Sequence, residues 1–546
     1  MSIPYLTSMV IFLPLVGALL TMVVRGDQAV RWTALGTTSL TFLLSIGLYV
    51  GFDPSISTAA APQLADLSSS WFPDAMDIKY YVGIDGLSIL LVMLTTLLGP
   101  IVVLSSWHYI GERRKAYYTL LLILQTGVTG VFCSFDVFLF YIFFELTLIP
   151  MYFIIGIWGG ERRIYAAVKF VLFTLVGSLL MLVGILYLGY LAGNAVNGGV
   201  FTTDWYKLLA YNTPIGLQGW LFVLFALSFA IKVPLFPLHT WLPDAHVEAP
   251  TGGSVILAGV LLKMGTYGLV RFCLPFFPNA AQDYAMAFAV LAVIGIIYAA
   301  LISRVQSDAK RLVAYSSVSH LGFVVLGIFA FTAEAMQGAV IQMVNHGIST
   351  GALFLLVGML YERRHTREMG DFGGLAKAVP ILTFFMVFSV LASAGLPGLN
   401  GFVGEFLILL GAFKSDVLAS PMLVALATTG VILAAVYLLW MVYRTFYGPL
   451  DNDANRSMVD MNGREIALMA PLALLMVILG FAPNTFLQKS EPMTDFLLET
   501  IEQKRVAAIE AHEAENVASF FDAPSTEPDG RGANHPSTSA PVATHP

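Results

Sequence analysis

Long apolar runs separated by short polar stretches dominate the chain. A helix needs about 20 apolar residues to span a bilayer, and on that criterion the pattern predicts fourteen membrane spans. The twelfth expected span, 378–412, is too long for one straight helix and should break near Pro397. The predicted limits are 3–24, 32–51, 84–106, 115–134, 137–157, 164–192, 215–235, 251–273, 284–302, 309–331, 335–361, 378–412, 421–445 and 465–483. The fold class is therefore an all-α polytopic membrane protein.

Composition supports a membrane protein and excludes several other classes. Of the 546 residues, 57% are hydrophobic and only 12% are charged, whereas soluble domains carry about 25% charged residues. This excludes a soluble enzyme, a nucleic-acid binder and a disordered scaffold. Most of the net charge of -7 comes from the stretch after Asn484, which holds ten acidic and four basic residues.

Motifs for a metal or a nucleotide are missing from the sequence. The two cysteines, Cys133 and Cys273, are far apart and form no zinc or iron–sulfur pattern. There is no Walker A motif, and no GxGxxG follows a strand-like run. The expectation is that this chain itself binds no cofactor and no metal.

Lysine and arginine are distributed unevenly between the two sides of the membrane. Eighteen of them follow odd-numbered spans and four follow even-numbered spans before the last one. Positive residues favour the cytoplasmic side. Both termini are therefore predicted on the periplasmic side of a bacterial cytoplasmic membrane.

Two five-span blocks have matching helix breaks. In each block the fourth span contains a proline interruption, near Pro234 in the first and near Pro397 in the second. An odd number of spans inverts the second block, and inverted repeats with discontinuous helices are typical of ion carriers. The expected organisation is 1–107 for three N-terminal spans, 115–273 and 284–445 for the two repeats, 465–483 for the last span, 484–521 for an amphipathic segment and 522–546 for a disordered tail.

Four charged residues lie within or beside the predicted spans, namely Glu145, Lys232, Lys263 and Glu405. Each mid-membrane charge costs about 2.5–3.5 kcal/mol of insertion free energy. The four residues must therefore serve a purpose that outweighs this cost. One interpretation is structural, with Glu145 and Lys232 paired between helices. A buried pair is often no better than apolar packing, and this favours the second interpretation, a proton relay in which lysine and glutamate switch between charged and neutral forms.

Histidine suits a proton carrier because it titrates near neutrality. His320 follows Ser316 and Ser317, whose hydroxyls could hold water beside it, and His346 follows Gln342 by four residues. Both histidines could equally be ordinary helix contacts. We expect His320 in the relay and His346, Ser316 and Ser317 in supporting roles.

A further polar cluster follows the first helix break. His239, Asp244, His246 and Glu248 have the residue types of a metal site. They also lie where a polar loop is expected at a membrane edge. We therefore favour a polar loop over a metal site, and we expect His239 to support the relay.

Several long motifs resemble a known family. The stretches FDVFLFYIFFELTLIPMY, KVPLFPLHTWLPDAHVEAPTGGSVILAGVLLKMGTYGLVRF, SDAKRLVAYSSVSHLGF and GLPGLNGFVGEF are similar to the subunit M family of bacterial proton-pumping NADH–quinone oxidoreductase, respiratory complex I. Its mitochondrial counterpart is subunit 4. The resemblance extends to the antiporter-like group shared with multi-subunit Mrp sodium/proton antiporters and some membrane hydrogenases.

The resemblance implies a role for each charged position. Glu145 would pair with Lys232, Lys263 would be the central relay group, His320 would continue the path and Glu405 would deliver protons outward. Sister antiporter-like subunits usually carry lysine at the Glu405 position. Redox chemistry would take place in partner subunits that bind NADH, FMN, iron–sulfur clusters and quinone.

Two other functions stay open on the sequence alone. A sodium/proton antiporter subunit has the same fold, and a structural membrane spacer would need none of the charges to titrate. The expected partners are other membrane subunits of complex I, including sister antiporter-like subunits, and membrane lipid.

Overall fold

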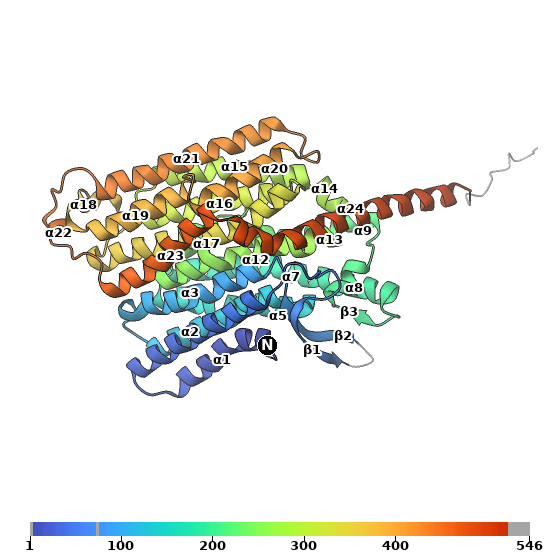
Figure 1. Cartoon of the computed structure of the whole chain (residues 1–546), viewed down its shortest axis with the longest axis horizontal. Coiled ribbons are helices and arrows are strands. Elements are labelled where there is room, and N and C mark those ends of the chain that lie inside the picture. Colours follow the sequence, from blue (N-terminus) through green and yellow to red (C-terminus); the bar gives the residue numbers. More distant parts are fainter. Residues whose placement is uncertain (1–3, 73–75, 522–546) are drawn as a thin grey trace, which may run out of the picture.

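The computed structural model describes residues 4–72 and 76–521 as a bundle of long, roughly parallel helices (Figure 1). In this part of the chain, thirteen helical segments are long and apolar enough to cross a membrane. The broken pair α19 and α20 completes the fourteen predicted spans. The bounds are α1 Leu6–Val23, α2 Asp27–Gly51, α3 Ile89–Tyr109, α4 Arg114–Cys133, α5 Val137–Leu146 with α6 Leu148–Trp158, α7 Arg163–Val196, α9 Ile215–Lys232, a run at Thr251–Phe276, α15 Ala285–Val305, α16 Ala309–Ile328, α17 Ala333–Arg364, α19 Pro380–Ser393, α20 Asn400–Phe413, α21 Pro421–Phe446 and α23 Gly463–Phe481.

Both predicted helix breaks are present. Helix α9 ends at Lys232, and eight residues that include Pro234 separate it from α10 (Trp241–Glu248). Between α19 and α20, Gly395 and Gly398 adopt positive φ angles of 78° and 91° on either side of Pro397. Proline removes a backbone donor and glycine tolerates the left-handed conformation, so both breaks follow from local chemistry. The inverted-repeat relation between the two blocks stays a prediction.

The run at Thr251–Phe276 lies at the centre of the bundle, and all of its residues are buried. It consists of α11 Thr251–Ile256, η1 Leu257–Leu261, α12 Leu262–Gly268, η2 Leu269–Cys273 and α13 Leu274–Phe276. The segments η1 and η2 are π-helical and flank Lys263. Single π turns within helices often occur at functional sites.

A small three-stranded sheet lies outside the predicted spans. Strands β1 (Gln63–Phe72) and β2 (Met76–Ile84) form an antiparallel hairpin, and β3 (Phe201–Thr202) joins β2 in parallel. The hydropathy pattern predicts no strand here, because β1 is largely polar and exposed. The all-α prediction is confirmed for the bundle and incomplete for this extramembrane region.

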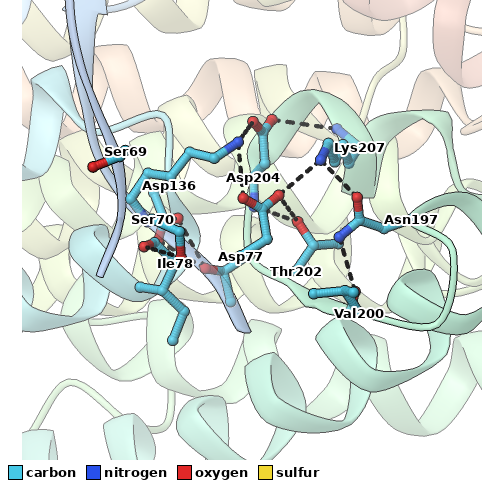
Figure 2. A network of polar contacts seen from close by, with 12 residues as sticks. Ser69, Ser70, Asp77, Ile78, Asp136, Asn197, Val200, Thr202, Asp204 and Lys207 are labelled. Atoms are coloured by element: carbon cyan, nitrogen blue, oxygen red, sulfur yellow. Dashed lines mark hydrogen bonds and ion pairs between the residues drawn. The ribbon is translucent and has the colours of Figure 1, made fainter. Parts of the chain in front are cut away.

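Ion pairs connect the hairpin to the helices (Figure 2). The Asp77 carboxylate accepts from Lys207 at 2.7 Å and lies 2.9 Å from Lys79 Nζ. Asp136 caps α5 by accepting from two of its first backbone N–H groups, and it also accepts from the Lys79 backbone at 3.1 Å. The hairpin is therefore attached to the start of α5, the helix that carries Glu145.

Helix α24 (Asn484–Phe521) covers the segment expected to be amphipathic. Its N-terminal part packs on the bundle, where Lys489 Nζ donates to the Phe52 carbonyl and Lys504 Nζ to the Leu209 carbonyl. Its far end extends beyond the bundle (Figure 1). The tail expected to be disordered, 522–546, lies outside the described residues.

Candidate functional site

Lys263 lies on α12 in the middle of the bundle and is fully buried. Its ammonium group donates to His346 Nδ1 on α17 at 2.6 Å and also contacts the Ala258 carbonyl. A buried ammonium without a carboxylate is held here by a carbonyl and an imidazole. The imidazole is also a base that can accept its proton.

The row continues from His346 to His320 on α16, with the two ring centroids 6.0 Å apart. His320 Nδ1 lies 2.7 Å from Glu405 Oε1, and its Nε2 lies 3.3 Å from the Tyr437 hydroxyl. All of these side chains are buried. Three helices and the broken-helix segment α20 thus bring Lys263, His346, His320 and Glu405 together, and we call this set the relay row.

Glu405 ends the relay row beside the second helix break. Its Oε1 also accepts from Gln342 Nε2 at 3.2 Å, whereas its buried Oε2 has no hydrogen-bond partner in the described part of the chain. Asn345 donates to the Asn400 carbonyl at 2.7 Å and Asn400 donates back to the Asn345 carbonyl at 3.2 Å. These two bonds hold the start of α20 against α17 and so fix the position of Glu405.

Glu145 and Lys232 do not form the expected contact. No ion pair within 4 Å joins them in the described residues, and Glu145 is only half-buried. The buried Lys232 ammonium lies over the Phe144 ring at 5.0 Å and the Phe170 ring at 5.5 Å from its centroid. Aromatic faces attract a cation and stabilise it without neutralising it.

The residues expected to support the relay have different partners. Ser316 and Ser317 donate to the Val313 carbonyl of their own helix at 2.7 and 3.4 Å. His239 lies in the break after α9, buried between the Phe236 and Tyr298 rings at 5.6 and 5.4 Å. Of the residues expected to support the relay, His346 alone lies within the row.

Two further buried groups were not expected to join the site. Lys310 at the start of α16 donates to the Ala249 carbonyl at 2.5 Å and the Val247 carbonyl at 3.3 Å. His246 on α10 is fully buried, stacks on Phe354 at 4.6 Å, and neither ring nitrogen has a partner in the described part of the chain. Lys310 is one of the eighteen cations that follow odd-numbered predicted spans, and its place in SDAKRLVAYSSVSH, ten residues before His320, is a signal for a role beside the relay.

A cavity of about 320 Å³ lies beside Lys310. Its walls include the charged side chains of Glu248, Asp308 and Arg367 together with Lys310. A polar cavity of this size accommodates water. Water can therefore approach a buried lysine from one end of the bundle.

The cluster considered as a metal site is dispersed. Asp244 pairs with Lys169 at 2.7 Å, Glu248 accepts from the Arg162 backbone at 2.9 Å, and His246 stacks on a ring. Within residues 4–72 and 76–514, no three His, Cys, Asp or Glu side chains are placed to hold a metal ion. The donor set does not fit a metal here.

Two family models match the chain. The model described as NADH:quinone oxidoreductase/Mrp antiporter, TM matches residues 134–433, and the one described as NADH-ubiquinone oxidoreductase chain 4, amino terminus matches residues 9–129. NADH-quinone oxidoreductase subunit M of Rhodobacter capsulatus is 44% identical over 88% of this chain and 93% of its own length. The subunits M of Pseudomonas aeruginosa and Escherichia coli K12 are 43% and 42% identical over 90% of the chain and 96% of theirs.

Solved structures have the same fold. A chain of respiratory complex I from Thermus thermophilus with bound NADH superposes with a TM-score of 0.81 and 34% identity, covering 91% of this chain and 99% of that one. A chain of the archaeal membrane-bound sulfane sulfur reductase superposes with a TM-score of 0.79 over the same shares. At 22% identity, the second likeness concerns the fold alone.

Proposed function

The chain belongs to the NADH-quinone oxidoreductase subunit M family, and on that premise we propose that it moves protons across the membrane as a subunit of respiratory complex I. The observation that carries the proposed path is the relay row, in which Lys263 contacts His346 and His320 contacts Glu405 inside the bundle. The row combines an ammonium, two imidazoles and a carboxylate, each of which can exchange a proton.

The proposed proton movement uses the contacts of the relay row in order. Lys263 gives a proton to His346 Nδ1, with which it already shares a hydrogen bond. The 6.0 Å between the two imidazole rings is bridged by a ring rotation or one water molecule. His320 then protonates Glu405, whose free Oε2 offers an onward acceptor.

Other buried charged groups would deliver protons to the relay row and control their transfer. Lys310 lines the water-accessible cavity, and the buried His246 lies on α10, which packs against α16. In this proposal both residues load Lys263. Lys232 would act as a gate, because a charge change near Glu145 alters how strongly it holds its proton. A tenfold change in proton affinity requires about 1.4 kcal/mol, which a desolvated charge interaction can supply.

The proposal places the redox cofactors and the quinone site in other subunits of the complex. We propose that NADH, FMN, iron–sulfur clusters and quinone are bound by partner subunits and that this chain has no redox site. The partners include sister antiporter-like membrane subunits. The chain would lie in a bacterial cytoplasmic membrane with both termini on the periplasmic side, as the lysine and arginine distribution suggests.

The test uses the intact complex carrying Lys263→Met in proteoliposomes. Loss of a positioned proton-transfer group lowers the rate on the order of a hundredfold, so NADH-driven proton uptake should nearly vanish. NADH oxidation by an artificial acceptor should stay normal. The matched control removes the exposed ion pair between Lys414 and Glu334 by Lys414→Met and should pump normally. Normal pumping by Lys263→Met, or a sodium requirement in the native complex, would contradict the proposal.

A further inference from the structure

A shallow, widely open groove of about 630 Å³ lies on the side of the bundle between α1, α4 and α6, whereas the relay row lies on other helices. Its walls are mostly apolar and include Leu120 and Ile123 from α4 and Phe153 and Ile157 from α6. All four side chains lie on helices that span the membrane. Such a groove has the shape and chemistry to hold a hydrocarbon chain.

Two cations stand at one end of the same groove. Arg113 and Lys115 line its rim, and both are exposed. In the described part of the chain neither lies within 4 Å of a carboxylate, and the Lys115 ammonium donates only to the Met22 carbonyl, at 3.1 Å. Glu112 is the acidic residue adjacent in sequence, and its carboxylate makes no ion pair in the described residues.

The backbone adds to the positive potential at this rim. Arg113 is the N-cap residue of α4 and makes no side-chain capping bond. The first amides of α4 are thus left without a side-chain acceptor, at the end of the helix where the dipole favours an anion. The neighbouring Arg114 is already used, since it pairs with Asp27.

We propose that this groove binds an acidic glycerophospholipid of the surrounding bilayer, with its phosphate at Arg113 and Lys115 and one acyl chain along Leu120, Ile123 and Phe153. The argument is charge complementarity in one continuous site. A soluble anion would use the rim but not the apolar walls, and a neutral lipid would use the walls but not the rim. The site is independent of proton transfer.

The experiment places the intact complex in nanodiscs of phosphatidylcholine that contain a trace of phosphatidylglycerol with a photoactivatable acyl chain. Labelling should occur on residues 116–123 and 153–157 and should exceed that by the same probe built on phosphatidylcholine. Cations near a membrane surface contribute about 1 kcal/mol each, so the double variant Arg113→Gln/Lys115→Gln should lower labelling roughly thirtyfold.

Two further variants make the result specific. Ile123→Trp fills the groove while keeping both cations, and it should also abolish labelling. Lys377→Gln/Arg456→Gln removes two exposed cations elsewhere and should leave labelling unchanged. NADH–quinone activity of each complex verifies assembly.

Three outcomes would overturn the proposal. Equal labelling by the two lipid probes would show that the rim charges do not select the lipid. Competition by inorganic phosphate would indicate a soluble anion. Labelling of a neighbouring subunit in place of residues 116–123 would show that protein, rather than lipid, covers the groove.

Discussion

The buried charges of this bundle fall into two regions that differ in how closely their members touch. Around α12, α16, α17 and α20, Lys263 contacts His346 at 2.6 Å and His320 contacts Glu405 at 2.7 Å. Around α5 and α9, the Lys232 ammonium faces two phenyl rings, and no ion pair joins it to Glu145 in the described residues.

The difference shows that a membrane protein can hold a buried cation in two ways. Hydrogen bonds to an imidazole connect Lys263 to the next titratable group, whereas aromatic faces stabilise Lys232 and leave it unconnected. A connected region can pass a proton through small rotations. A separated region needs water or a side-chain movement first, which is the property of a gate.

The largest effect is expected at the end of the connected region. Glu405→Gln keeps the hydrogen-bonding shape but cannot take up the relayed proton, so NADH-driven proton uptake in proteoliposomes should fall on the order of a hundredfold. Glu405→Asp should retain part of the activity because it keeps a titratable group. Equal pumping by the two variants would argue against protonation at this position.

The separated region should respond strongly but less completely. Lys232→Ala and Glu145→Ala should each lower coupled NADH–quinone activity about tenfold or more. This is the effect expected when a gating charge changes the proton affinity of a relay group tenfold. Phe144→Leu should have a smaller effect, because it removes one ring and keeps the lysine. Normal proton pumping in Glu145→Ala would refute the role of Glu145.

Substitutions of the two histidines test whether direct side-chain contacts within the connected region are needed for proton transfer. His346→Ala should slow pumping roughly tenfold, because it removes the group that accepts from Lys263 and a bridging water is a weaker substitute. His320→Ala should have the smaller effect of the two. The measurement is the ratio of proton uptake to NADH oxidation, and a larger loss for His320→Ala would reverse the proposed order of importance.

Lys504 is a buried lysine outside the relay row, so it shows what burial alone does to a lysine in this protein. It lies on α24 outside the spanning helices, and burial lowers the pKa of its ammonium group to about 7. Undocked α24 then binds more protons between about pH 7 and pH 10.5, so docking should strengthen as the pH rises through this window. Lys504→Met should remove the slope.

Hydrogen exchange in α24, corrected for the intrinsic rate at each pH, measures this small effect. Arg505→Gln is the control, because its ion pair with Glu502 is partly exposed and contributes little. An unchanged slope in Lys504→Met would assign the pH dependence to another group.

Much of the fold could be predicted from the sequence because a bilayer imposes strict rules. Backbone groups in hydrocarbon must bond within their own helix, so apolar length alone locates the spans. Proline and glycine mark where α9 and α19 stop. The hairpin escaped prediction because β1 is too polar to stand out and is held by long-range pairs such as Asp77 with Lys207.

The candidate site could be predicted only as a set of residue types. Mid-membrane charges identify Lys263 and Glu405, since their insertion is costly. The position of His346 between Lys263 and His320 depends on how α17 packs against α12 and α16, which no linear pattern states. For the same reason the separation of Glu145 from Lys232 could not be foreseen.

The π-helical segments η1 and η2 on either side of Lys263 would allow its side chain to rotate. A π turn contains one residue more than an α turn needs, and an exchange of backbone hydrogen bonds would shift this extra residue along the helix. Each one-residue step turns the side chains it passes by about 100° around the axis. A surplus residue passing Lys263 would swing its ammonium away from His346 while the run at Thr251–Phe276 keeps both of its ends in place, so this contact would open without any helix moving as a whole.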